Sequence, residues 1–135
     1  MKRYLLDTNI ISYFIRGFAI ELINRVTQVL EAQSAMISVI TRAELRFGQA
    51  GLVAADKRKR AIDLVLTQLT VLPWTSAAAD TYGPLKDTLK RQGRPIGDMD
   101  TLIAAHALTE DLILVTHNTR HFENVPGLKL EDWMV

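Results

Sequence analysis

Cysteine is absent from this chain of 135 residues. Its absence excludes disulfide bonds, zinc sites built on thiolates and a thiol nucleophile. Long apolar runs are missing as well. The first apolar run stops at Asp7 after three residues, which is too short for the core of a signal peptide, and no other run approaches the ~20 apolar residues of a membrane span. We therefore expect a soluble, cytoplasmic protein that associates with no membrane.

A charge excess of one sign is missing, and aromatic residues are few. The formal net charge is +1, so a surface that attracts nucleic acid has to be local. Aromatic residues make up 7%, and core positions compete for the side chains that are candidates for stacking on bases, namely Tyr13, Phe14, Trp74 and Tyr82. The hydrophobic content of 48% is typical of a globular protein, and no repeat or linker-like stretch divides the chain. We expect one domain over residues 1–135.

Short apolar runs alternate along the chain with segments of helical periodicity. The runs predict strands at residues 4–6, 35–38, 71–72 and 112–116, and a weaker pattern favours an edge strand at 128–130. The apolar spacing predicts helices near residues 9–17, 19–32, 39–48, 54–69, 76–92 and 99–110, with 51 as an alternative end of the third. Gly83 and Pro84 should bend or interrupt the fifth helix. This alternation predicts an α/β fold with a largely parallel central sheet.

Acidic residues occur close to the ends of these strands. Asp7 directly follows the first strand, and Glu44 lies six residues after Ser38, which ends the second. Asp98 and Asp100 open the helix before the last long strand. In open parallel sheets, ligands gather beyond the carboxyl ends of the strands. We therefore expect Asp7, Glu44 and Asp100 to come together at one edge of the sheet.

Three clustered carboxylates repel one another strongly unless a cation neutralises them. Oxygen ligands without cysteine or an obvious histidine pair favour Mg²⁺ or Mn²⁺ over zinc. Such a site activates water and stabilises charge on a phosphoryl oxygen, which is the chemistry of metal nucleases. The residues alone leave a plainer alternative open, in which Asp7 caps a helix and Glu44 is a surface residue. Against it, Glu44 lies beside Ala43 and Phe47, which we place on the inward side of their helix.

Three regions of the sequence carry a family pattern: YLLDTNIIS at the start, ISVITRAELRFG in the middle, and GRPIGDMDTLIAAHAL, LILVTHNTRHF and VPGLKLEDW towards the end. Through them the chain resembles the PIN-domain family, and within it the VapC-type toxins of bacterial toxin–antitoxin pairs. The resemblance implies a three-layer α/β/α fold, usually a homodimer, and an endoribonuclease that depends on Mg²⁺ or Mn²⁺. It also implies that a VapB-like antitoxin inhibits the enzyme, and that toxin and antitoxin can form a larger assembly. Relatives with the pattern GRPIG…EDW suggest initiator transfer RNA as the substrate.

Carried over by position, Asp7, Glu44 and Asp100 match the acidic metal ligands of the family. The resemblance implies that they hold the metal and the water that attacks the phosphodiester. Where the family often has a fourth acid, this chain has Asn118, whose amide oxygen can ligate a hard cation or orient water but adds no charge. The number of metal ions that the site binds, one or two, is therefore left open. Supporting roles fall to Thr8, Asn9, Asp98 and Thr116.

Asp98 and the histidines are expected to have tasks other than primary metal binding. Asp98 lies about 200° around the helix from Asp100, and as an N-cap it would satisfy a free backbone N–H. His106 lies about 240° from Asp100 and should not face the site. We expect His117 and His121 on surface loops, and we expect a carboxylate rather than a histidine as the proton acceptor.

Local basic residues are the candidates for binding RNA phosphates. Those nearest the inferred site are Arg42, Arg46, Lys90, Arg91 and Arg94. The densest basic run, residues 57–60, is diluted by two nearby acids and is interpreted as a solvated helix face, with RNA contact as the alternative. The apolar and aromatic residues of the first helices offer a surface for a second subunit or for an antitoxin helix.

Two other functions fit parts of the pattern. A PIN nuclease of RNA maturation or messenger turnover would share the site, but it is disfavoured by the short chain without an appended RNA-binding domain. A receiver-like signalling domain also clusters acids at strand ends, but it needs a phosphoacceptor Asp where this chain has Ser38 and Pro73. The gene directly upstream would distinguish a toxin, which follows a small antitoxin, from a receiver, which follows a sensor kinase.

Overall fold

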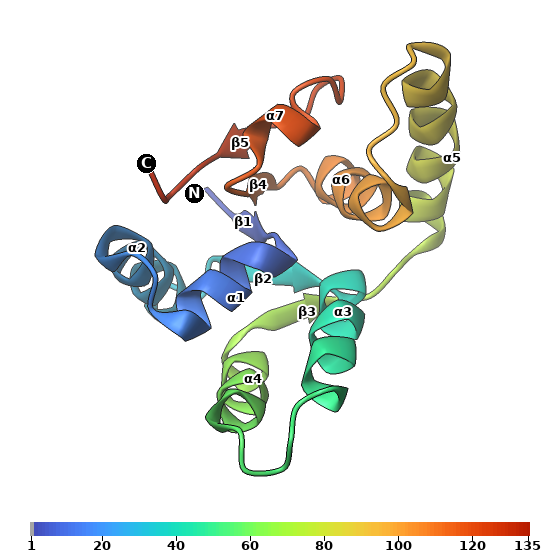
Figure 1. Ribbon diagram of the computed structural model, residues 1–135. Coiled ribbons are helices and arrows are strands. Elements are labelled where there is room, and N and C mark those ends of the chain that lie inside the picture. The colour runs from blue at the N-terminus through green and yellow to red at the C-terminus, as the bar shows by residue number, and fades with distance from the viewer. Residues whose placement is uncertain (1) are drawn as a thin grey trace.

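A five-stranded parallel sheet forms the middle of the molecule (Figure 1). The computed structural model describes residues 2–135 and places the strands in the order β3-β2-β1-β4-β5, with every neighbouring pair parallel. The strands are β1 (Tyr4–Leu6), β2 (Ala35–Ser38), β3 (Thr70–Leu72), β4 (Ile113–Val115) and β5 (Leu130–Glu131). The predicted parallel α/β sheet is confirmed, and the predicted edge strand is β5, displaced slightly along the chain.

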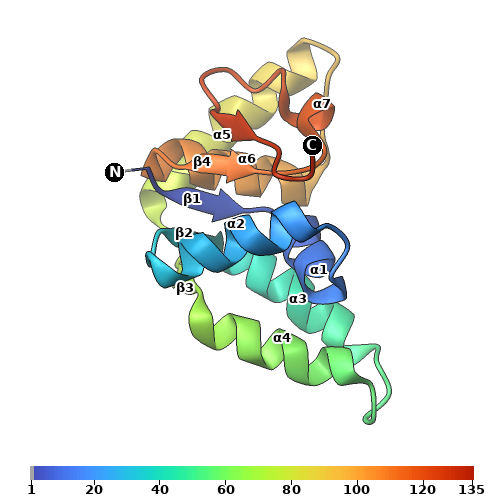
Figure 2. The same ribbon diagram turned by 90° about the vertical axis from the view of Figure 1, so that its left-hand side faces the viewer.

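Helices cover both faces of the sheet. Within residues 2–135 they are α1 (Thr8–Arg16), α2 (Ile20–Glu31), α3 (Val39–Ala50), α4 (Lys57–Gln68), α5 (Ser76–Arg91), α6 (Asp98–Glu110) and α7 (Thr119–Phe122). Figure 1 shows α1 and α2 on one side of the sheet and α5 and α6 on the other, and Figure 2 views the sheet from the side that α2 covers. This is the three-layer α/β/α arrangement that the resemblance implies. None of these helices has the length and apolarity needed to cross a membrane.

Alternate residues of the strands supply two hydrophobic cores, one on each face of the sheet. Leu6 and Val115 are register partners and belong to the core that also contains the buried side chains of α1, α2 and α4. Leu5 and Leu114 are the preceding pair and belong to the core formed with α5, α6 and α7. All four side chains are fully buried. β1 and β4 are continuous apolar runs because both of their faces are covered.

The strands β1 and β2 pass into helices through single polar residues. Asp7 follows β1 and caps α1, since its Oδ1 accepts the N–H of Thr8 at 2.8 Å. Ser38 ends β2 and caps α3, since its Oγ accepts the N–H of Ile40 at 3.0 Å. Because these junctions are so short, the first turns of α1 and α3 lie directly at the carboxyl edge of the sheet, where ligands of such folds bind.

Two helix predictions need correction. α4 begins at Lys57 rather than near residue 54, because Asp56 caps it and its Oδ1 accepts the N–H of Arg58 at 2.9 Å. α5 is not interrupted at Pro84. Pro84 lies on the exposed face of α5, where water can reach the carbonyl that its missing N–H leaves without a partner.

Candidate metal centre

Asp7 is a buried acid at the carboxyl end of β1, with 5% of its surface exposed. Its Oδ1 accepts the N–H of Thr8 at 2.8 Å, and its Oδ2 accepts the hydroxyl of Thr116 at 2.9 Å. The pKa of Asp7 is raised to about 6. Burial is the largest cause, the hydrogen bond from Thr116 opposes it, and the negative charges of Asp100 and Glu44 add to it. Burial therefore destabilises the charged form of Asp7 relative to an exposed acid, and a cation beside it would offset this cost.

Glu44 reaches the same edge from the second turn of α3, where its Oε1 accepts the hydroxyl of Thr8 at 2.6 Å. The Thr8 hydroxyl has a single hydrogen, so Thr41 is the donor in the 3.2 Å contact between the two threonine hydroxyls. The placement of Ala43 and Phe47 on the inward side of the helix is wrong. Phe47 is 84% exposed and Ala43 is also exposed. The buried side of α3 carries Thr41 instead, and Glu44 is half-buried beside it.

Asp100 is half-buried in the first turn of α6. Its Oδ2 lies 2.8 Å from Nε2 of His121, a residue of α7. The same Nε2 is 2.7 Å from the carbonyl oxygen of Ile96, which can only accept, so this nitrogen carries a proton. Burial raises the pKa of Asp100, and His121 opposes the rise. The expectation of a surface role for His121 is therefore wrong, and no local spacing could reveal its contact with Asp100.

Thr116 joins Asp7 to the loop that carries Asn118. Its hydroxyl donates to Asp7 and accepts the backbone N–H of Asn118 at 3.1 Å. A cavity of about 250 Å³ opens beside these groups and is lined by Asp7, Asn9, Tyr13, His117 and Asn118. Asn118 and Asn9 thus border the space next to Asp7. The resemblance gives Asn118 the position of a fourth ligand and Asn9 a supporting role.

The three acids share one edge of the sheet, but two of them are turned to protein partners. Glu44 and Asp100 both lie close enough to Asp7 to raise its pKa. Within residues 2–135, however, no three acidic, histidine or cysteine side chains are arranged to hold a metal ion together. Glu44 is bonded to Thr8 through Oε1, and Asp100 to His121 through Oδ2, so these contacts leave the second oxygen of each carboxylate as the donor for a metal ion. The donors themselves fit a hard divalent cation, because they are carboxylate oxygens whose mutual repulsion such a cation relieves.

Asp98 does not cap α6, contrary to the prediction. The N-cap is Gly97, whose φ of +88° favours glycine, and the cap involves no side-chain hydrogen bond. Asp98 is the first residue of the helix, its side chain is 76% exposed, and its Oδ1 lies 3.0 Å from Nζ of Lys86 on α5. Asp98 and Asp100 therefore contact different neighbours, as their angular separation predicts.

The other two histidines lie as expected. The side chain of His117 is 46% exposed, and its Nδ1 is 3.0 Å from Oδ2 of Asp132. His106 is fully buried, and its Nδ1 lies 2.7 Å from Oγ of Ser38 rather than in the acid cluster. Neither spacing nor periodicity indicates the contact between His106 and Ser38, which joins residues from opposite halves of the chain.

Three of the five predicted phosphate-binding residues are engaged with other side chains. The pairs are Arg46–Asp63 at 2.6 Å, Arg91–Asp87 at 2.9 Å and Arg94–Asn124 at 2.8 Å. Of the other two, Arg42 lies on α3 two residues before Glu44, and Lys90 lies in the last turn of α5. The guanidinium groups nearest in sequence to the acids are thus directed mainly to protein partners.

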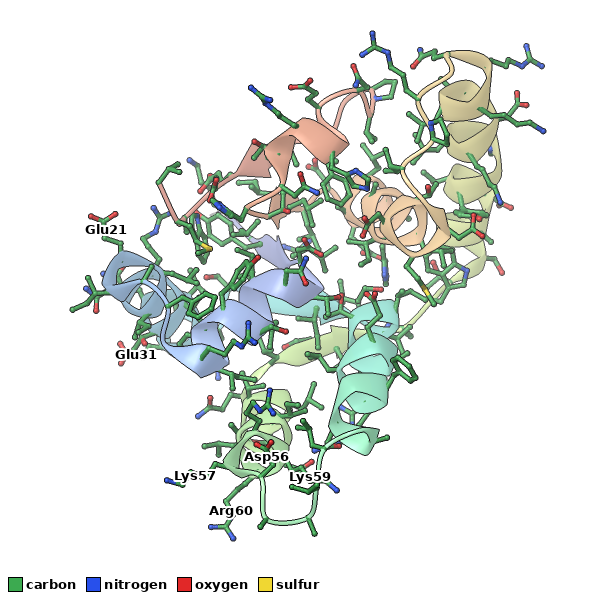
Figure 3. All side chains as sticks on the ribbon, in the orientation of Figure 1. Glu21, Glu31, Asp56, Lys57, Lys59 and Arg60 are labelled. Carbon is green, nitrogen blue, oxygen red and sulfur yellow. The ribbon has the colours of Figure 1, made fainter. Side chains whose placement is uncertain are left out.

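Two further arginines, Arg16 and Arg58, line the same groove as Glu44. This groove, of about 370 Å³, is lined by residues of α1, α3 and α4 that include Thr8, Asn9, Glu44, Arg16 and Arg58. Arg58 also forms a 2.7 Å ion pair with Asp56. Figure 3 shows the rest of the basic run, Lys57, Lys59 and Arg60, around the outer end of α4. The run therefore borders the groove through Arg58, and its other members form a solvated face.

The fold and the position of the acids define the class of protein. A parallel sheet in the order β3-β2-β1-β4-β5 carries its acids where β1, α3 and α6 meet. Residues 4–128 match the family model of the PIN domain. The chain belongs to the PIN-domain family.

Relatives of this chain include VapC proteins. It is 39% identical over 130 residues to ribonuclease VapC1 of Haemophilus influenzae strain R2866. The matched residues make up 96% of this chain and 97% of the relative. It is 37% identical to the tRNA(fMet)-specific endonuclease VapC of Shigella flexneri, with 98% and 99% covered. A chain of the DNA-bound VapBC structure from Salmonella typhimurium matches with a TM-score of 0.90 and 32% identity, over 98% of this chain and 99% of that one.

Proposed function

We propose that this protein is an endoribonuclease that depends on Mg²⁺ or Mn²⁺, and that it is the toxin of a toxin–antitoxin pair. The observation that carries the proposal is Asp7, a buried acid at the carboxyl end of β1 whose pKa is raised to about 6 beside Glu44 and Asp100. A carboxylate with a purely structural role is costly in such a place, whereas a cation ligand is stabilised there once the cation binds. The ribonuclease and endonuclease names of the VapC relatives support the reaction class.

The proposed roles follow from the contacts of each residue. The metal ligands are Asp7, Glu44 and Asp100. A bound Mg²⁺ or Mn²⁺ ion supplies an activated water and stabilises charge on a phosphoryl oxygen. The hydroxyls of Thr116 and Thr8 orient the carboxylates of Asp7 and Glu44. The amide of Asn118, beside Asp7, orients water or the phosphate, and a carboxylate of the cluster accepts the proton.

The proposed partner is a small VapB-like antitoxin. The VapBC structure from Salmonella typhimurium supports this partner. The concentrated carboxylates favour a basic carboxy-terminal antitoxin segment that enters the acid cluster through Arg or Lys. Phe47 of α3 and Leu64 of α4 are 84% and 59% exposed and offer apolar surface to an antitoxin helix or to a second copy in a homodimer.

The proposed substrate is initiator transfer RNA, supported by the identity to the tRNA(fMet)-specific endonuclease of Shigella flexneri. A receiver-like domain is not favoured, because the chain belongs to the PIN-domain family and because β2 and β3 end in Ser38 and Leu72 rather than next to a phosphoacceptor acid. A PIN nuclease of RNA maturation would use the same acids, so the substrate distinguishes it from a toxin.

The test uses the purified protein, freed of any bound antitoxin, with initiator and elongator transfer RNA. We expect cleavage of the initiator RNA in Mg²⁺ or Mn²⁺, none in chelator, and none by Asp7→Asn with its fold verified by circular dichroism. Asp80→Asn is the matched control, because Asp80 is an exposed acid on α5. Full cleavage in chelator or by Asp7→Asn would contradict the metal nuclease, and equal cleavage of both RNAs would contradict the substrate.

A further inference from the structure

The hydroxyl of Ser38 connects the start of α3 to the middle of α6. Ser38 is fully buried, and its Oγ accepts the N–H of Ile40 as the cap of α3. Oγ also lies 2.7 Å from Nδ1 of His106, which is fully buried on α6. The simplest pattern that satisfies both contacts has the Ser38 hydroxyl donating to Nδ1, which leaves the His106 ring neutral with its proton on Nε2. Burial lowers the pKa of His106 and so favours this neutral form.

Core filling alone does not explain a histidine at position 106. Its Nε2 is buried, and none of the residues 2–135 gives it a hydrogen bond of good geometry, although the backbone of Pro73 lies close enough to raise the pKa of the ring. The ring packs edge-on against Trp74 at 5.4 Å between centroids. An apolar side chain would fill the same space without leaving a buried nitrogen unpaired. What a histidine adds here is the acceptor Nδ1 for the Ser38 hydroxyl.

The two helices that this hydrogen bond joins each carry one of the proposed metal ligands. On α3, Glu44 lies six residues after Ser38, and on α6, Asp100 lies six residues before His106. Within residues 2–135, no other side-chain hydrogen bond joins α3 or its cap to α6. Six residues of α-helix span about 9 Å, so a tilt of about 6° at the contact displaces an acid by about 1 Å. A misplacement of that size can lower catalysis about 100-fold.

We propose that His106 is a positioning residue, which sets the separation of Glu44 and Asp100 through its hydrogen bond to Ser38. This inference rests on the proposed metal-dependent cleavage. It completes a set of hydroxyl contacts around the cluster, in which Thr116 holds Asp7 and Thr8 holds Glu44. His106 touches neither the substrate nor the acids and acts through the placement of the two helices.

The experiment compares three variants. His106→Leu removes the acceptor and leaves the Ser38 cap in place. His106→Asn keeps an acceptor, because Oδ1 of Asn branches from Cγ as Nδ1 of His does. Ile103→Val is the matched control, because Ile103 is a fully buried residue of the same helix, three positions away, and makes no polar contact. The measurements are kcat and KM for RNA cleavage, Mn²⁺ affinity by titration calorimetry, and melting temperature.

His106→Leu should lower kcat and Mn²⁺ affinity by about tenfold or more, with little change in KM, because it acts on the ligand arrangement. His106→Asn should recover most of both quantities. Ile103→Val should lower the melting temperature while leaving kcat and Mn²⁺ affinity as in the unmodified chain.

Three results would overturn the proposal. His106→Leu could bind Mn²⁺ and cleave normally, His106→Asn could be as impaired as His106→Leu, or Ile103→Val could lose activity to the same degree at equal destabilisation. If the unmodified protein neither binds Mn²⁺ nor cleaves RNA, the proposed function itself fails, and this inference fails with it.

Discussion

Replacing Asp7 by asparagine should stabilise the metal-free protein at neutral pH while abolishing cleavage. The pKa of Asp7 is raised from 3.8 to about 6 in the folded protein, mainly by burial. This difference corresponds to about 3 kcal/mol by which the charged carboxylate destabilises the folded state at pH 7. Asparagine removes that charge and keeps an acceptor for the N–H of Thr8. Its NH₂ group takes the place of Oδ2, which accepts the Thr116 hydroxyl in the unmodified protein. The loss of that hydrogen bond costs about 1 kcal/mol. The expected net gain is about 2 kcal/mol.

The sign of the pH dependence follows from the direction of the shift. Below pH 3.8 the carboxyl of Asp7 is protonated in both the folded and the unfolded chain, and the penalty is absent. Between pH 3.8 and pH 6 the unfolded chain ionises while the folded chain keeps its proton, so the free energy of unfolding falls as the pH rises, and it levels off above pH 6. Relative to Asp7→Asn, the unmodified protein should therefore lose about 2 kcal/mol of unfolding free energy between pH 4 and pH 7.

The assay is urea unfolding in chelator at a series of pH values, followed by circular dichroism. Subtracting the free energy of unfolding of Asp7→Asn at each pH cancels the contributions of the groups that titrate alike in both proteins. Mn²⁺ should then stabilise the unmodified chain and leave the variant unchanged, because a ligand stabilises only the state that binds it. A variant that is less stable than the unmodified chain at pH 7, or a stability difference that is the same at pH 4 and pH 7, would refute this reasoning.

Three further outcomes are expected. Asp100→Ala should abolish metal-supported cleavage, whereas Asp98→Ala, which loses an exposed contact with Lys86, should cleave normally. RNA cleavage by the two variants decides this, and the opposite result would reverse the assignment. Thr116→Val should lower the free energy of unfolding by about 1–3 kcal/mol, because it removes the donor to Asp7, and Thr116→Ser should restore most of it. Urea unfolding checks this pair, and equal stability of all three proteins would contradict the role of the hydroxyl. An antitoxin without its basic carboxy-terminal segment should inhibit cleavage more weakly, and equal inhibition in the same assay would contradict entry of that segment into the acid cluster.

The elements that could be predicted are those that periodicity and strand ends determine. β1, and β2 up to its last residue Ser38, are apolar because both faces of the sheet are covered, so each could be recognised as a short run. Asp7 and Asp100 could be assigned to one edge because the first strand ends there and the helix before the fourth strand begins there, and the charge of Asp100 is close enough to raise the pKa of Asp7. The resemblance added which of the two acids in GDMD belongs to the cluster.

The contacts that could not be predicted depend on tertiary structure. The pairing of His121 with Asp100 requires α7, which has four residues and is too short to show a periodicity. The cap of α6 depends on the positive φ of Gly97, which the sequence does not specify. Arg46 forms an ion pair with Asp63 because α3 and α4 pack together. The sequence distance between Arg46 and Glu44 gives no information on that packing.

Sequencing of newly formed RNA ends in cells is the most direct test of the central claim. The unmodified chain and Asp7→Asn would each be expressed briefly, with and without the antitoxin, in a host whose growth the toxin arrests. The account predicts one dominant new end in initiator transfer RNA that appears only with the unmodified chain and disappears when the antitoxin is present. The same new end with Asp7→Asn, or growth arrest by the unmodified chain without any new RNA end, would contradict an endoribonuclease built on Asp7, Glu44 and Asp100.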